Sequence, residues 1–190
     1  MRISKKGVTL IELLIVVGVI SIVAAVGGDI LLTVVRAYKK AQILGTVEQN
    51  GSLASTLMEN NLRNSAVIKY FDNSIGDFVE VSEGQTEYTD YVKITSAQGV
   101  SSTIQFVEGG VSGTCPNGEI RVDGVTVTNT DVNSGVNIIK GGSSIFTIYN
   151  PEGGPPIVTA LFKVTQACQS PVTASAEFNT TVTLRGSYGN

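Results

Sequence analysis

The stretch KKGVTLIELLIVVGVISIV, from Lys5 to Val23, places one carboxylate, Glu12, inside an otherwise apolar run that follows a short basic leader. A charged side chain at the centre of a bilayer costs about 2.5 to 3.5 kcal/mol on insertion scales. Such a residue therefore usually has a functional partner. At about 1.5 Å per helical residue, the segment from Val8 to Gly28 spans roughly 30 Å, one hydrocarbon core. The sequence predicts a membrane-spanning helix with Glu12 as its candidate functional residue.

The residues that flank this apolar segment set its orientation. Arg2, Lys5 and Lys6 precede it, which puts the N-terminus in the cytoplasm and the rest of the chain outside. This pattern disfavours a buried helix of a soluble protein. A cleaved secretory signal is one alternative, although Glu12 interrupts its apolar region and residues 24–28 contain no clean Ala-x-Ala site. A plain single-span anchor is the other alternative.

The residues Lys6 to Leu13, KGVTLIEL, resemble the class III signal of type IV prepilins and type II secretion pseudopilins. The resemblance implies that a prepilin peptidase cleaves between Gly7 and Val8 and methylates the new N-terminus at Val8. It also implies that Glu12 neutralises the N-terminal ammonium of a neighbouring subunit. The family usually has phenylalanine where this chain has Val8.

The physical role expected of Glu12 in a filament is to set register. An N-terminal ammonium and a carboxylate four residues later share one helix face, yet the carboxylate can instead meet the ammonium of the next subunit. Opposite charges attract strongly in a dry environment, but the cost of desolvating both offsets much of that gain. We therefore expect Glu12 to act as a docking residue more than as a source of stability.

Beyond Gly28 the apolar pattern becomes one-sided, which is typical of an amphipathic helix. We expect one long helix from about Thr9 to Ile68, ended by Asp72-Asn73-Ser74. Glycine inside a helix costs about 1 kcal/mol relative to alanine. Four glycines therefore mark expected positions of bending or melting: Gly27, Gly28, Gly45 and Gly51.

From Phe78 onward the chain is rich in valine, threonine, glycine and asparagine with alternating polarity, which indicates strands. Asp123-Gly124 is a two-residue hairpin signal. The expected strands are Asp77–Val81, Tyr91–Thr95, Ser102–Val107, Glu119–Val122, Val125–Thr128, Ser144–Tyr149, Val158–Thr165 and Phe178–Arg185. The predicted fold class is α+β, with the long helix packed on an antiparallel sheet, and the resemblance implies that this fold is pilin-like.

This reading divides the chain into four parts. Residues 1–7 are a leader peptide, 8–28 a transmembrane and filament-core helix, 29–70 its amphipathic second half, and 71–190 a globular β-rich domain.

Cys115 and Cys168 are the only cysteines, and both lie on the exported side of the span. An oxidising compartment favours a disulfide between them, and members of the family often cross-link their C-terminal region in this way. Two unpaired buried thiols are the alternative. Two cysteines without any histidine do not make a zinc site.

Composition argues against several other functions. The absence of histidine removes Ser-His and Cys-His nucleophile pairs, so we expect no enzyme and no cofactor, and an acid-dependent hydrolase would need two converging carboxylates. Without the leader, the chain has ten basic and sixteen acidic residues, a side-chain charge of −6, which disfavours binding of nucleic acid.

The cluster Arg36, Lys39 and Lys40 is expected to be a solvated face or to pair with neighbouring subunits. Asn129 to Gly135 partly resembles a calcium loop but lacks its glycine and final glutamate, so we expect a polar turn.

The sequence thus predicts a structural subunit of a type IV pilus or of a type II secretion pseudopilus. Its expected partners are other pilin or pseudopilin subunits, the prepilin peptidase, a membrane assembly platform and, before assembly, membrane lipid. Residues 57–66 and 180–186 faintly resemble minor subunits. The expected location is the cytoplasmic membrane, then a surface or periplasmic filament. An uncleaved single-span surface binding or adhesion protein is the alternative.

Overall fold

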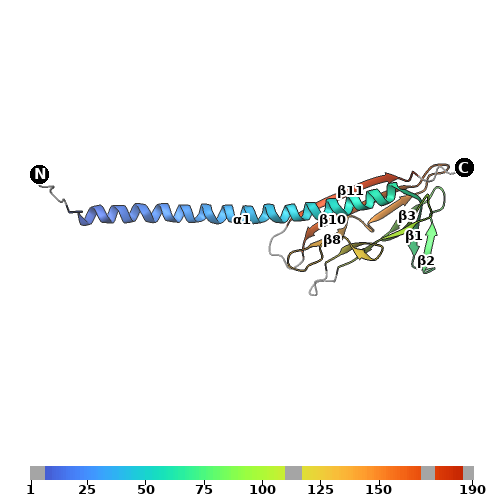
Figure 1. The fold of residues 1–190 in the computed structure, drawn as a ribbon. Helices are drawn as coiled ribbons and strands as arrows, with labels where there is room; N and C mark the ends of the chain where they lie inside the picture. The colour runs from blue at the N-terminus through green and yellow to red at the C-terminus, as the bar shows by residue number, and fades with distance from the viewer. Residues whose placement is uncertain (1–6, 110–116, 168–173, 186–190) are drawn as a thin grey trace. The chain divides into compact units, whose positions relative to one another are not determined.

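The computed structural model describes residues 7–109, 117–167 and 174–185 (Figure 1). The chain forms two compact units, Met1–Ala41 and Gln42–Asn190. One α-helix, α1 (Leu10–Arg63), contributes residues to both units. The strands of the described residues are β1 (Ser65–Asp72), β2 (Asp77–Glu80), β3 (Thr86–Thr89), β4 (Tyr91–Ser96), β5 (Ser101–Val107), β6 (Glu119–Val122), β7 (Val125–Thr126), β8 (Val136–Lys140), β9 (Phe146–Tyr149), β10 (Ile157–Gln166) and β11 (Ser175–Thr183).

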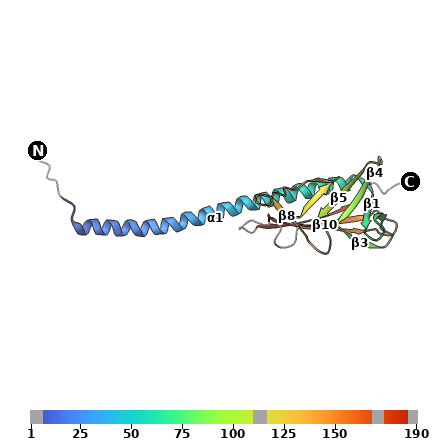
Figure 2. The same ribbon diagram turned by 90° about the horizontal axis from the view of Figure 1, so that it is seen from below.

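The strands of the second unit form two antiparallel sheets. The first has the order β2-β1-β4-β5-β6-β7, and the second has the order β11-β10-β9-β3 with β8 also paired to β10. Figure 2 shows β1, β4 and β5 side by side in the first sheet. The β6–β7 hairpin turns at Asp123 and Gly124, whose φ angles of 51° and 79° are both positive. Both angles match a type I′ turn, so the hairpin prediction is confirmed.

The part of α1 within the second unit packs along the globular domain through one stripe. Its buried residues recur at spacings of three and four, and they are Val47, Gly51, Ala54, Met58 and Leu62. Figure 1 shows this part of α1 running beside β11. The Ser55 and Thr180 hydroxyls are hydrogen-bonded at 2.7 Å across that boundary.

At Gly51 a side chain of β11 packs closely against α1. A Cβ atom at this position would overlap the Phe178 ring, and that ring stacks on Phe162 of β10 with centroids 5.4 Å apart. Gly51 was expected to weaken the helix, but the helix continues through it, and the missing side chain makes room for an aromatic ring. This gain in packing offsets the conformational cost of a helical glycine.

A single hydrophobic core joins α1 to both sheets. Along β10 the side chains alternate between buried and partly exposed positions, with Val158, Ala160, Phe162 and Val164 on the buried face. β4 and β5 contribute Val92 and Ile104 from the other sheet in the same way. Such alternation is expected when one face of an antiparallel sheet covers a core. The predicted α+β class, a long helix packed on antiparallel strands, is confirmed.

The predicted end of the helix, at Ile68 with the amphipathic part extending to residue 70, is wrong. α1 ends at Arg63, and residues 65–72 form β1. This segment contains β-branched and aromatic side chains, which fit a pleated surface, and it pairs with both β2 and β4. The Ser65 hydroxyl donates to the Asn61 carbonyl at 2.6 Å, which satisfies one of the free carbonyls at the helix end.

The predicted strands otherwise overlap strands of the structure, with differences at their ends. Three strands were missed: β1, β3 and β8. β3 and β8 lie in stretches rich in polar residues, where alternation is weak. The sequence also predicted one sheet, whereas the described strands form two. Finally, α1 is helical without interruption at Gly27, Gly28 and Gly45, so the helix does not melt at these glycines.

Candidate functional site

The start of α1 is held by a side-chain cap. The backbone N–H of Glu12 donates to Thr9 Oγ1 at 3.4 Å, and that of Leu13 donates to the Thr9 carbonyl at 3.2 Å. Thr9 is therefore the N-cap residue, and Glu12 is the third residue of the helix. A carboxylate in this first turn interacts favourably with the helix dipole. The sequence reasoning overlooked Thr9, although the spacing Thr-x-x-Glu is the signature of a capping box.

Glu12 is exposed, and its carboxylate makes no hydrogen bond or ion pair with any described residue. It is the only ionisable side chain between residues 8 and 28. Ser21, by contrast, donates its hydroxyl to the Val17 carbonyl at 2.8 Å. Such back-bonding within a helix satisfies a hydroxyl without an external partner. Glu12 thus stands out in this segment as a charged group without a partner among the described residues.

The surface around Glu12 is apolar on all sides of the helix. Leu10 is 81% exposed and Ile22 is 68% exposed, and the aliphatic side chains between them are exposed as well. A helix that is hydrophobic all round requires a lipid or protein environment. By length and composition α1 is able to cross a membrane. The N-terminal part of α1 therefore offers a large apolar surface with one carboxylate near its start.

Gly7 and Val8 lie before the helix, in exposed backbone without regular structure. A peptidase needs such accessible, non-helical backbone around the bond that it cleaves. The expectation that Val8 and Glu12 share one helix face is not met, because α1 begins at Leu10 and Val8 precedes its cap. The carboxylate is therefore not aligned with its own Val8 by helix geometry.

The other predicted site residues are placed as follows. Cys115 and Cys168 lie outside the described residues. Arg36, Lys39 and Lys40 are exposed on α1, and none forms an ion pair with a residue that the structure describes. They agree with a solvated basic face in this single chain.

The loop from Asn129 to Gly135 is a polar turn organised by Asp131. Asp131 Oδ1 accepts hydrogen bonds from the backbone N–H groups of Ser134 at 2.7 Å and Asn133 at 3.0 Å, and from the Ser134 hydroxyl at 2.9 Å. The Ser134 backbone bond is the largest cause that lowers the pKa of Asp131 below its usual range. In the described ranges, no three Cys, Asp or Glu side chains gather as a metal site would require.

Residues 2–28 match the family described as the prokaryotic N-terminal methylation motif. The comparisons with curated proteins and with solved structures gave no match. The matched segment contains Gly7, Val8 and Glu12, and it covers the start of α1 with its exposed apolar surface. The chain thus carries a prepilin-type N-terminus on a long apolar helix and has a pilin-like architecture, consistent with the type IV pilin and pseudopilin family. The motif implies a structural subunit that is anchored in the membrane before it assembles with other pilins.

Proposed function

We propose that this chain is a subunit, and more specifically a minor subunit, of a type IV pilus or a type II secretion pseudopilus. It is stored in the cytoplasmic membrane with the β-rich domain outside. The prepilin peptidase cleaves it after Gly7 and methylates Val8, and a membrane assembly platform then transfers it into a surface or periplasmic filament.

The observation that carries this proposal is the start of α1: an apolar surface exposed all round that contains one carboxylate, Glu12, without a partner among the described residues. A lipid bilayer covers such a surface but leaves a charge without a counterion. A bundle of helices from neighbouring pilin subunits covers the surface as well, and it brings the N-terminal ammonium of one subunit to the carboxylate of another. Filament assembly therefore accounts for both features, whereas simple anchoring accounts for one.

Intact-mass spectrometry of the chain from the membrane and from sheared filaments tests this proposal. We expect the filament subunit to lack Met1 to Gly7 and to carry one methyl group on Val8. A Gly7→Glu variant should remain full-length in the membrane and be absent from filaments. Assembled subunits that retain Met1 to Gly7 would contradict the proposal. A full-length chain confined to the cell surface would support the alternative, an uncleaved single-span binding protein.

We also propose that Cys115 and Cys168 form a disulfide. Residues that lie close in sequence to each cysteine contact the same strand, β8. The Ile138 N–H of β8 donates to the Gly118 carbonyl at 3.0 Å. Gln166 of β10 pairs with Val136 at the start of β8. A bridge there closes a loop of about fifty residues and contributes roughly 4 kcal/mol in the chain-entropy model.

Peptide mapping without reductant, after alkylation of free thiols, tests this disulfide. One linked pair of peptides is expected. Alkylated Cys115 and Cys168 in protein purified without reductant would refute it. A Cys168→Ala variant should lose stability in the β-rich domain and still insert into the membrane.

A further inference from the structure

A groove in the β-rich domain, remote in sequence from the N-terminal motif, has the composition of a ligand site. Its volume is about 620 Å³, within the range of small-molecule pockets. It is lined by four aromatic residues, Phe71, Tyr88, Tyr91 and Phe106, together with amide and hydroxyl side chains. We propose that this groove binds a neutral saccharide.

Two of the four aromatic residues that line the groove, Phe71 and Tyr91, belong to one cluster of packed rings. Phe71, Phe78 and Tyr91 pack together with ring centroids 4.9 to 5.5 Å apart. Tyr88 lies beyond them on β3, the edge strand of its sheet, and is 63% exposed. An exposed ring on a fixed strand gives a flat apolar surface at little entropic cost. The C–H faces of a pyranose ring pack well on such a surface.

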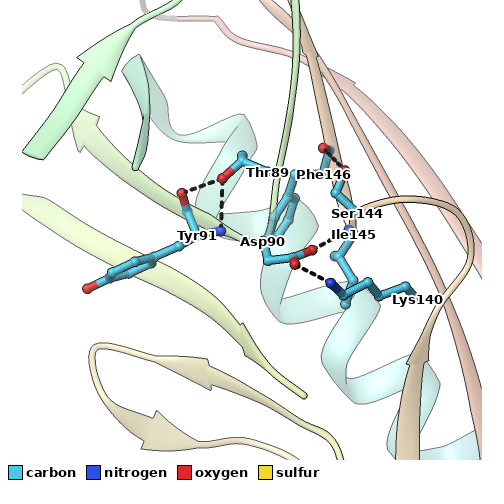
Figure 3. A network of polar contacts seen from close by, with 7 residues as sticks. All are labelled: Thr89, Asp90, Tyr91, Lys140, Ser144, Ile145 and Phe146. Carbon is cyan, nitrogen blue, oxygen red and sulfur yellow. Dashed lines mark hydrogen bonds and ion pairs between the residues drawn. The ribbon is translucent and has the colours of Figure 1, made fainter. Parts of the chain in front are cut away.

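The one charged residue that lines the groove, Asp90, is held by contacts within the protein. Asp90 Oδ2 pairs with Lys140 Nζ at 2.6 Å, and Asp90 Oδ1 accepts a hydrogen bond from the Ile145 N–H at 2.9 Å (Figure 3). The Asp90 carbonyl also accepts from the Phe106 N–H at 2.8 Å. Asp90 therefore joins β5 and the loop before β9 to the turn between β3 and β4. Its charge is balanced by Lys140, so the groove favours an uncharged ligand.

Thr89 and Ser144 are also occupied by the protein itself. The Thr89 hydroxyl bonds the Tyr91 backbone twice, at 3.1 Å each, and the Ser144 hydroxyl donates to the Phe146 carbonyl at 3.0 Å (Figure 3). These contacts fix the lining before any ligand arrives, which lowers the cost of binding.

The remaining polar groups in the lining suit a ligand rich in hydroxyls. Asn73, Gln105 and Ser143 line the groove, and their side chains make no hydrogen bond with residues in the described ranges. An amide both donates and accepts, as a sugar hydroxyl does. Aromatic faces, free amides and a neutralised carboxylate together match a neutral sugar better than a phosphate or a charged peptide.

The test uses the full chain in a detergent without a sugar headgroup. Saturation-transfer NMR would be recorded with a panel of neutral oligosaccharides: chitotriose, cellotriose, maltotriose and lactose, with sialyllactose as the anionic comparison. We expect saturable binding of at least one neutral sugar. Tyr88→Ala should weaken it about tenfold, the loss of one stacked aromatic contact, and Gln105→Ala should weaken it as well. Tyr149→Ala is the matched control, because Tyr149 is a partly exposed tyrosine that does not line the groove.

Each outcome decides the proposal. Neutral-sugar binding that falls with Tyr88→Ala and Gln105→Ala but not with Tyr149→Ala supports it. Three results would overturn it: no binding of any sugar in the panel, a preference for sialyllactose, or neutral-sugar binding that is unchanged in both Tyr88→Ala and Gln105→Ala. An extended peptide that pairs with the edge strand β3 and occupies the groove instead would also overturn it. The measurement uses unassembled protein, so its result is separate from that of the filament proposal.

Discussion

The part of α1 in the first unit and the part in the second unit are both helical. They differ in whether their apolar side chains are exposed or buried. In the first, Leu14 is 65% exposed and its aliphatic neighbours are similarly uncovered. In the second, Met58 and Leu62 are fully buried in the core shared with the β-sheets. Helix periodicity alone does not distinguish these cases. What distinguishes them is whether the chain itself supplies a cover for the apolar side chains.

The same contrast holds for charge. Asp131 in the globular unit has three hydrogen-bond donors to one of its oxygens, whereas the Glu12 carboxylate has no partner among the described residues. A folded domain satisfies its polar groups internally. The first part of α1 leaves both its apolar surface and its charge for another molecule, which is the behaviour expected of an assembly element.

The largest contrast between the two parts should come from truncating a leucine in each. Leu62→Ala is expected to lower the free energy of unfolding by about 2 to 5 kcal/mol, because it leaves a cavity in the core. Leu14→Ala should change it by less than about 0.5 kcal/mol, since that side chain is exposed. Denaturant unfolding of the full chain in micelles measures both. Equal losses would show that the first part also belongs to the folded core.

Two glycines of α1 provide a smaller contrast. Gly51→Ala should destabilise the domain by about 1 to 3 kcal/mol, because the new methyl group overlaps the Phe178 ring. Gly45→Ala meets open space, so it should stabilise the helix by up to about 1 kcal/mol. A double-mutant cycle with Phe178→Ala should show that the loss at Gly51 depends on this ring. Additive effects would contradict the packing role of Gly51.

The smallest expected effect concerns Asp131. Hydrogen bonds in the folded state, first of all from the Ser134 backbone N–H, hold its pKa below the usual value of about 3.9. The unfolded chain therefore takes up this proton more readily than the folded chain. The stabilising contribution is complete above the unfolded pKa and is lost as the pH falls through the lower folded pKa. Below about pH 4, unfolding free energies of the wild type should decline more steeply than those of Asp131→Asn. Parallel pH profiles would show that the turn does not depend on this carboxylate.

The sequence predicted those features whose physical cause is local. The apolar run with Glu12, the Asp123-Gly124 hairpin and most strands follow from composition and alternation. The end of α1 was missed because Ala66 continues the helical spacing from Leu62, and the pairing of β1 with β2 and β4 outweighs this local pattern. The role of Gly51 depends on Phe178, and the groove joins residues from β1 to the loop before β9. Contacts so distant along the chain leave no periodic signal in the sequence.

The central claim is that Glu12 docks one subunit on another, and Glu12→Val tests it most directly. In the bilayer the carboxylate contributes nothing favourable, so the variant should insert at least as well as the wild type. In the filament its removal leaves the Val8 ammonium of a neighbour uncompensated, at a cost of several kcal/mol. Glu48→Val is the matched control, an exposed helical glutamate outside the apolar segment.

The membrane and filament pools of each variant should be quantified together with the extent of cleavage at Gly7. We predict that Glu12→Val accumulates in the membrane, is cleaved normally and is absent from filaments, while Glu48→Val assembles. Assembly of Glu12→Val at the wild-type level with normal cleavage would contradict the account.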